Sequence, residues 1–165
     1  MREIRKAGTG DIPLIRELTF AIWPQTYSSI ISKEQIEYML DMIYSPASLQ
    51  KQMGEEGCTF IIVYDDNVPV AFASYNEIGL QTWKLNKIYI LPSQQGKGTG
   101  KFMINYIVDE LRQEHHATSL QLQVNRHNKA KDFYEKLGFK IIQTADFDIG
   151  NGFFMNDYVM EYRLS

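Results

Sequence analysis

The feature that most limits how this chain can fold is a glycine-rich segment between a strand pattern and a helical pattern. Residues 95–100 read Gln-Gly-Lys-Gly-Thr-Gly, after apolar residues 88–91 and before a helical stretch that starts at Lys101. A turn of this kind leaves main-chain N–H groups unpaired at the positive end of the helix dipole, and glycine lets an anion approach them closely. The segment predicts a phosphate or pyrophosphate site. A connector that binds no ligand is the alternative.

Two widespread nucleotide motifs do not fit this spacing. A P-loop that ends at Lys101 requires glycine at position 95 and serine or threonine at 102, where the chain has Gln95 and Phe102. A dinucleotide-binding fingerprint that starts at Gly96 requires its third glycine at the position of Lys101. Neither nucleotide-binding fold is therefore expected.

Hydrophobic periodicity along the whole chain alternates between strand and helix. Asp11 is expected to cap the first helix, and Pro24 is expected to end it and open a loop over residues 23–27. Ser32 is expected to cap the next helix, with Gln35 completing a capping box. The order predicts a single α/β domain over residues 1–165, one mixed sheet with about seven strands and four to five helices. Expected strands lie around Ile4 and at 59–64, 68–76, 82–91, 119–124, 139–147 and 154–163, and later helices at 46–53, 101–114 and 128–137.

A second segment, residues 128–139, predicts a helix that packs on the sheet. Ala130, Phe133 and Leu137 share one helical face, and Gly138 suits the position just after a helix end. Tyr134 lies about 100° round from its neighbour, at the edge of this face. By packing alone, Tyr134 is more simply a core residue than a catalytic one.

The two segments together resemble the GNAT superfamily of N-acetyltransferases. Residues 95–100 match the family motif Gln/Arg-x-x-Gly-x-Gly/Ala, which binds the pyrophosphate of coenzyme A, and residues 128–139 match its second cofactor-binding segment. The resemblance covers nearly the whole chain and is looser over residues 1–57. It implies the GNAT-like acyl-CoA N-acyltransferase fold. It also implies an enzyme that moves an acetyl group from acetyl-coenzyme A directly to a primary amine within a ternary complex.

The resemblance implies roles for individual residues as well. Tyr134 is expected near the thioester sulfur, where it would protonate the departing thiolate. Main-chain groups of Ile88 and Ile90 are expected to pair with the pantetheine arm, and the N–H groups from Gly96 to Lys101 are expected to bind the pyrophosphate. The implied coenzyme A-binding set is Ile88, Tyr89, Ile90, Gln95, Gly96, Lys97, Gly98, Thr99, Gly100, Lys101, Asn128 and Tyr134.

The general base and the acceptor site are less clearly marked. Some members of the superfamily carry a glutamate on the third antiparallel strand, but residues 82–88 read Thr-Trp-Lys-Leu-Asn-Lys-Ile and contain no carboxylate. Glu77, at the end of the preceding strand, is the nearest candidate, with a water relay or a solvated loop charge as alternatives. Aromatic rings that could hold an ammonium are Trp23, Tyr27, Tyr75 and Trp83, with core or rim packing as the alternative for each.

The C-terminal tail, residues 148–164, resembles the bacterial spermidine/spermine acetyltransferase branch. A polyamine acceptor would suit the acidic residues Asp146, Asp148 and Asp157, whose alternative role is solvated surface charge. A protein N-terminus or lysine as acceptor and a non-catalytic acyl-CoA sensor on the same fold remain alternatives.

Composition limits the remaining partners. A formal net charge of -3 argues against nucleic acid, which needs a basic surface. No apolar run approaches the roughly 20 residues of a membrane span, so a cytoplasmic protein is expected. The adjacent pair His115-His116 cannot face one ligand from a helix, so no metal site is expected. A homodimer is compatible with the sequence.

Overall fold

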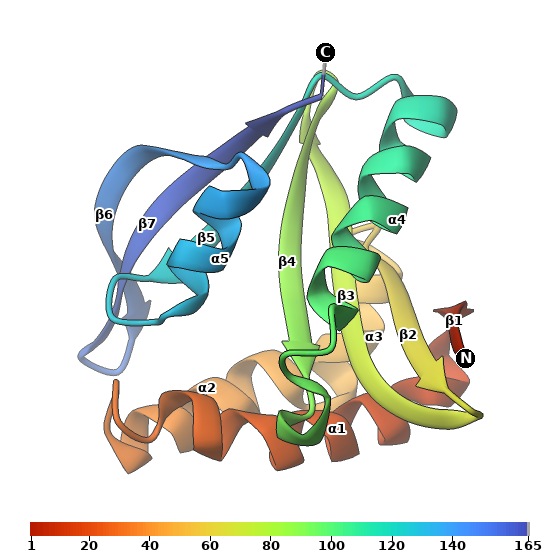
Figure 1. The fold of residues 1–165 in the computed structure, drawn as a ribbon. Coiled ribbons are helices and arrows are strands. Elements are labelled where there is room, and N and C mark those ends of the chain that lie inside the picture. The colour runs from red at the N-terminus through yellow and green to blue at the C-terminus, as the bar shows by residue number, and fades with distance from the viewer. Residues whose placement is uncertain (165) are drawn as a thin grey trace.

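The computed structural model describes residues 1–164 and contains one seven-stranded mixed sheet (Figure 1). Its strands are β1 (Arg2–Ala7), β2 (Thr59–Asp65), β3 (Val68–Gly79), β4 (Thr82–Ile90), β5 (Ser119–Asn125), β6 (Lys140–Gly150) and β7 (Phe153–Arg163). Their order in the sheet is β1-β2-β3-β4-β5-β7-β6. All neighbours are antiparallel except β4 and β5, which are parallel. The predicted mixed α/β sheet is confirmed.

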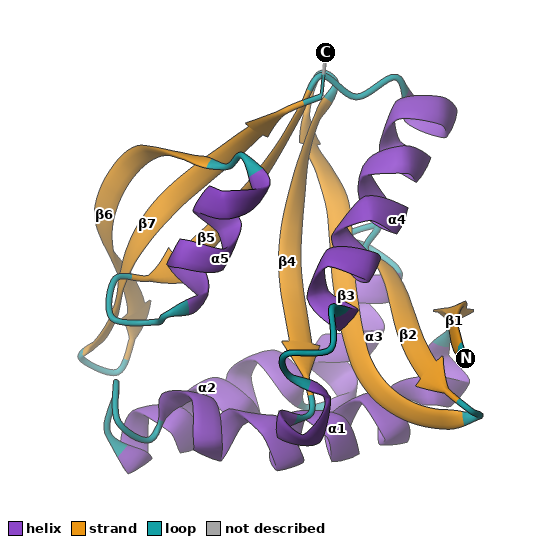
Figure 2. Ribbon diagram, viewed as in Figure 1, coloured by secondary structure: helices purple, strands orange, loops and turns teal. Residues whose placement is uncertain are grey.

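Helices cover both faces of this sheet (Figure 2). They are α1 (Ile12–Tyr27), α2 (Lys33–Tyr44), α3 (Pro46–Met53), α4 (Thr99–His115) and α5 (Ala130–Leu137). The first three pack on one face, where Ile15 and Ile22 of α1 are buried with Phe72 of β3. The other two pack on the opposite face, where Ile107 and Leu111 of α4 are fully buried. Within residues 1–164, no helix is both long and apolar enough to cross a membrane.

The parallel pair β4 and β5 is joined over a short stretch only and then diverges (Figure 1). Residues 82–85 of β4 pair with residues 119–122 of β5. Beyond Leu85, β4 pairs with β3 alone, so its other edge carries main-chain groups without strand partners as far as Ile90. The divergence opens the middle of the sheet.

A bulge in β4 decides which side chains face this opening. Ser74 of β3 lies opposite Lys87, but the next residue of β3 lies opposite Leu85, so Asn86 has no partner in the register. A one-residue insertion reverses the alternation of a strand. As a result, Leu85 belongs to the core under α4, whereas Tyr89 belongs to the core under α1 to α3.

The prediction that Pro24 ends the first helix is wrong, because α1 continues through Pro24 to Tyr27. Proline removes one helical hydrogen bond, but the Ser28 N–H donates to the Pro24 carbonyl at 3.1 Å, so the bonding resumes at once. The Trp23 ring lies 5.5 Å from the Tyr44 ring and is 2% exposed. Aromatic burial of Trp23 against α2 therefore keeps the predicted loop over residues 23–27 helical.

The predicted caps differ in outcome. Ser32 caps α2 as expected, since its Oγ accepts the Gln35 N–H at 3.1 Å. Gln35 does not complete the capping box, because its side chain donates to the Phe154 carbonyl at 2.7 Å and ties α2 to β7. Asp11 does not cap α1 through its side chain; it accepts the Gly8 N–H at 2.9 Å within a short 3₁₀ turn that precedes the helix.

Candidate active site

A large cleft of about 800 Å³ lies where β4 and β5 diverge. Its walls are the C-terminal part of α1 and the segment after it, β4, the loop between β4 and α4, β5, the segment after β5, and α5. The structure brings nearly the whole predicted coenzyme A-binding set together here; of that set, Lys97 alone does not line the cleft. The residues in the wall are Ile88, Tyr89, Ile90, Gln95, Gly96, Gly98, Thr99, Gly100, Lys101, Asn128 and Tyr134.

The loop before α4 presents free main-chain N–H groups at the large cleft. The helix begins at Thr99, two residues earlier than predicted, so the glycine-rich segment and the first helical turn overlap. Within the described chain, the N–H groups of residues 96–101 have no backbone acceptor, and pairing starts with the Phe102 N–H, which donates to the Gly98 carbonyl at 3.0 Å. Unpaired amides at a helix N-terminus form a site suited to an anion.

The three glycines of this loop serve different purposes. Gly96 and Gly98 have φ of 80° and 79°, a left-handed conformation that costs other residues about 1–2 kcal/mol. At Gly100 the constraint is space, because a Cβ atom would lie 3.0 Å from the Phe133 ring and 3.3 Å from Ile90. The first two glycines therefore shape the loop, and the third lets α4 pack closely beside α5 and β4.

Tyr134 of α5 combines burial with a place in the wall of the large cleft. Its ring packs against Phe133 at 5.4 Å and Phe139 at 5.7 Å between centroids. Burial raises the pKa of the Tyr134 phenol well above its ordinary value, and the nearby Tyr27 adds to the effect. The phenol therefore stays protonated at neutral pH and can serve as a proton donor. Tyr134 therefore packs in the core and lines the large cleft at the same time.

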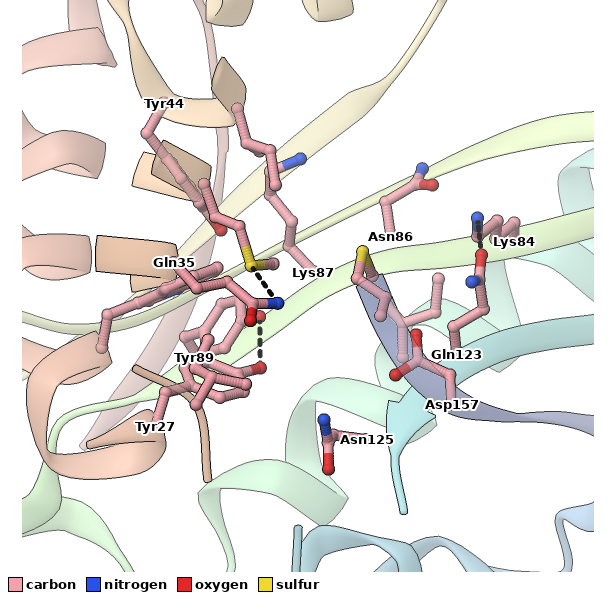
Figure 3. A pocket seen from close by; sticks show the side chains of 16 residues that line it. Tyr27, Gln35, Tyr44, Lys84, Asn86, Lys87, Tyr89, Gln123, Asn125 and Asp157 are labelled. Atoms are coloured by element: carbon pink, nitrogen blue, oxygen red, sulfur yellow. Dashed lines mark hydrogen bonds between the residues drawn. The ribbon is translucent and has the colours of Figure 1, made fainter. Parts of the chain in front are cut away.

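A small cavity of about 190 Å³ adjoins the large cleft on the α1 side of the sheet (Figure 3). Its walls come from α1, α2, β4, β5 and β7, five elements far apart in the sequence. The Tyr27 and Tyr89 hydroxyls lie 3.0 Å apart where the two spaces meet. The residues common to both walls are Tyr27, Leu85, Asn86, Lys87, Tyr89 and Gln123. The two spaces are thus adjacent and share part of their walls near the gap between β4 and β5.

Two of the four aromatic residues predicted for an acceptor site line the small cavity, namely Trp23 and Tyr27. The prediction is wrong for Tyr75 and Trp83, which belong to the core under α4 on the opposite face. Their ring centroids lie 6.2 Å apart, and the Trp83 ring is 4.6 Å from His115. Strand alternation places these rings on one face, but the sequence does not say which helix layer covers that face.

Glu77, the predicted candidate for the general base, is exposed near the end of β3, opposite Trp83. It lines neither the large cleft nor the small cavity. The β3–β4 hairpin end, where Glu77 lies, is the end at which β4 and β5 are still paired, whereas both spaces open where the strands diverge. The structure therefore contradicts this assignment.

Three charged side chains line the small cavity: Lys84 and Lys87 of β4, and Asp157 of β7 (Figure 3). Asp157 is 3% exposed, and burial raises its pKa to about 6 against the opposing effects of Gln123, Arg126 and Lys84. Burial lowers the pKa of Lys87 to about 8.

Sequence reasoning missed the two lysines and saw Asp157 only as one acid of the tail. Lys84 and Lys87 are three residues apart, so a regular strand would point them to opposite faces. The bulge at Asn86 puts both on the wall of the small cavity. The signal available in the sequence was that two lysines and an asparagine lie close together in one strand.

Comparisons with known proteins agree with this geometry. A family model described as an acetyltransferase (GNAT) domain matches residues 28–161. The spermidine N(1)-acetyltransferase of Thermoplasma acidophilum is 26% identical, over 98% of this chain and 96% of that protein. The ribosomal protein bS18-alanine N-acetyltransferase of Haemophilus influenzae is 30% identical, over 64% of this chain and 70% of that protein.

Solved structures extend the likeness to three dimensions. The crystal structure of the PaiA N-acetyltransferase from Thermoplasma acidophilum in complex with coenzyme A has a TM-score of 0.83 at 25% identity and covers 99% of both chains. The ribosomal-protein-S18-alanine N-acetyltransferase from Escherichia coli, at 20% identity and a TM-score of 0.75, shares the fold. Because the family match spans most of the chain, this protein belongs to the GNAT family of acetyltransferases.

Proposed function

We propose that this protein transfers an acetyl group from acetyl-coenzyme A directly to a primary amine, with the coenzyme in the large cleft and the amine in the small cavity. The observation that carries the proposal is the wall common to both spaces, formed by residues such as Tyr27, Asn86 and Gln123. Direct transfer needs the amine and the thioester in contact within one complex, and holding both in place supplies much of the rate acceleration.

The residues of the large cleft fit coenzyme A. The free amides of residues 96–101 suit a diphosphate at a helix start. The Thr99 hydroxyl is buried with no hydrogen-bond partner among the described residues, so a bound phosphate would satisfy it. The Asn128 side-chain carbonyl accepts the Ala130 N–H at 2.9 Å, which leaves its NH₂ group for the cofactor.

Coenzyme A, when bound, supplies the acetyl thioester. The unpaired edge of β4 offers main-chain N–H groups to the thioester carbonyl, where negative charge develops as the amine attacks. We assign to Ile88 and Ile90 the main-chain contacts along this edge, as the family resemblance implies. We assign to Tyr134 the proton that the departing thiolate takes up. The attacking amine must lose its own proton first, which for a lysine-like amine costs about 4.6 kcal/mol at pH 7.

The shape of the small cavity favours a small-molecule amine over a protein segment. Its volume is about 190 Å³, and the rings of Trp23, Tyr27, Tyr44 and Tyr89 form much of its wall. The relative named as a spermidine acetyltransferase supports a polyamine, the acceptor that the tail resemblance implies. A polycation would, however, meet Lys84 and Lys87 in this cavity, so the charge of the site does not support that choice.

Purified protein mixed with acetyl-coenzyme A and a panel of amines tests the proposal, with release of the free thiol as the signal. We expect thiol release that depends on the amine, and an acetylated product of the expected mass. Calorimetry with coenzyme A runs in parallel. Tight coenzyme binding without turnover on any amine would instead identify a non-catalytic acyl-CoA sensor, and no coenzyme binding would remove the assignment of the large cleft.

A further inference from the structure

The charged side chains of the small cavity are held by neutral amide groups. The Lys84 ammonium donates to Gln123 Oε1, and the Lys87 ammonium donates to Gln52 Oε1 at 2.6 Å. Gln123 also lowers the pKa of Asp157 and so favours its ionised form. Within residues 1–164, no ion pair at 4.0 Å or less neutralises any of the three. Each charge thus stands without a direct counter-charge.

The arrangement is costly for the folded protein, because charges taken out of water need compensation. The positive charge of Lys84 lowers the pKa of Asp157, and the negative charge of Asp157 raises the pKa of Lys84, so each favours the charged form of the other. The two side chains nevertheless form no ion pair. They come from different walls, Lys84 from β4 and Asp157 from β7, with Gln123 of β5 beside both (Figure 3). A cation and an anion kept apart across a cavity are matched by a ligand that carries both charges.

We propose that the acceptor is a small primary amine that also carries a carboxylate, as an amino acid does, bound with its amino group at Asp157 and its carboxylate at Lys84. This inference rests on the acetyl transfer proposed above. Lys87 adds positive potential from the same wall; its ammonium lies 5.4 Å from the centre of the Tyr44 ring and 5.7 Å from that of Phe60. One carboxylate against two ammonium groups suits an acceptor with a single amine and an anionic group.

Asp157 is then also the group that receives the proton of the bound ammonium. The N–C bond to the acetyl group forms and the C–S bond breaks. The ammonium gives up two protons in all: one leaves through Asp157 to solvent, and the other balances the proton that Tyr134 gives to sulfur. A pKa of about 6 lets Asp157 be ionised, and so able to accept a proton, at neutral pH. The groups that bear on this carboxylate are Gln123, Lys84 and Arg126.

The test uses matched acceptors with the full-length protein and acetyl-coenzyme A. Several amino acids are each compared with their amides and with the corresponding decarboxylated amines, alongside spermidine, spermine and a short peptide that begins with alanine. We expect kcat/KM for the amino acids to exceed that of their amides by about 10- to 100-fold, because the amides lose a charge-assisted contact.

Variants then test which residues cause the preference for amino acids over their amides. Lys84→Met should reduce the ratio of acid to amide to about one, since the cation that reads the carboxylate is gone. Asp157→Asn should lower turnover on acid and amide alike, by about 100-fold. Lys51→Gln, at an exposed position of α3, is the control and should leave the preference unchanged. Calorimetry with coenzyme A verifies that each variant is folded, and Lys84→Gln replaces Lys84→Met if that variant is not.

The outcomes separate this inference from the proposed function. Equal or faster turnover of the amides, or of spermidine, overturns the inference and leaves the acetyl transfer in place. An acid preference that survives Lys84→Met overturns the assignment of the carboxylate contact. No turnover with any amine overturns both proposals.

Discussion

The large cleft and the small cavity meet at the same point of the sheet but are built by different means. The large cleft is lined largely by short runs of consecutive residues, such as 85–90, 98–101 and 127–130, and the anion site proposed there consists of main-chain amides of residues 96–101. The small cavity is formed by side chains from five separate elements, and its polar groups include three charges. Main-chain recognition tolerates changes of side chain, whereas recognition by converging side chains depends on how each strand and helix is placed.

The two regions also differ in what they cost the fold. Unpaired amides at a helix start face water when no ligand is bound, so they cost little. Buried ammonium and carboxylate groups lose their hydration and destabilise the folded state unless they are compensated. The small cavity is therefore where stability and function should conflict, and the large cleft is where they should not.

Tyr134→Phe is expected to have the largest effect. Removal of the phenolic proton donor should lower kcat by about 100-fold or more, while the affinity for coenzyme A stays unchanged because the ring and its packing remain. Thiol-release kinetics and calorimetry measure the two quantities. Unchanged kcat would take the acid role away from Tyr134 and leave the large cleft as a binding site only.

Lys87→Met is expected to stabilise the protein at neutral pH. The pKa of Lys87 falls from an ordinary value of 10.5 to about 8 in the folded protein, which corresponds to about 3 kcal/mol against the charged form. Loss of the hydrogen bond to Gln52 offsets about 1 kcal/mol. The net gain of about 2 kcal/mol in unfolding free energy should be measurable by denaturant titration at pH 7.

The extra unfolding free energy of Lys87→Met should decrease as the pH rises. A lysine whose pKa is lowered on folding contributes stability that is present above the unfolded pKa and is lost as the pH falls through the folded pKa. The wild-type protein should therefore approach the variant in stability as the pH rises from 8 to 10.5. A gap between the two proteins that stays constant over this range would show that the ammonium is not the cause.

Gly98→Ala tests the main-chain site and should have the smallest effect. Alanine at a φ of 79° costs about 1–2 kcal/mol, and relaxation of the loop should weaken coenzyme A binding by about tenfold. Gly152→Ala is the matched control, with a φ of 78° and open space around it in the turn between β6 and β7. Both variants should lose similar stability, but only Gly98→Ala should lose affinity. Equal affinity in the two variants would argue against the anion site.

Sequence reasoning succeeded where function depends on neighbouring residues. The free amides of residues 96–101 follow from a local pattern. Tyr134 was expected at the edge of the buried face of α5, and it is instead more buried than Ala130, Phe133 and Leu137, which were expected to form that face. The same reasoning failed at Pro24, where packing of Trp23 against Tyr44 outweighs a local helix-ending signal. Propensity is a weak guide wherever tertiary contacts are strong.

Around the small cavity, sequence reasoning failed more often than it succeeded. Trp23 and Tyr27 line the small cavity, while Tyr75 and Trp83 lie in the core on the opposite face of the sheet. Glu77 was chosen because it is near in sequence, whereas Asp157, about 80 residues further along, is the carboxylate that lines the small cavity. Distance along the chain is a poor guide to distance in a sheet whose strand order differs from the chain order.

The sequence by itself determined the family, the mixed sheet and the glycine-rich loop with its free amides, because each depends on backbone conformations set by adjacent residues. Only the tertiary structure decided which residues line the small cavity. The bulge at Asn86 turns Lys84 and Lys87 to one face, and the sheet order brings Asp157 opposite them. Register and strand order arise from contacts between distant segments, so no local pattern encodes them.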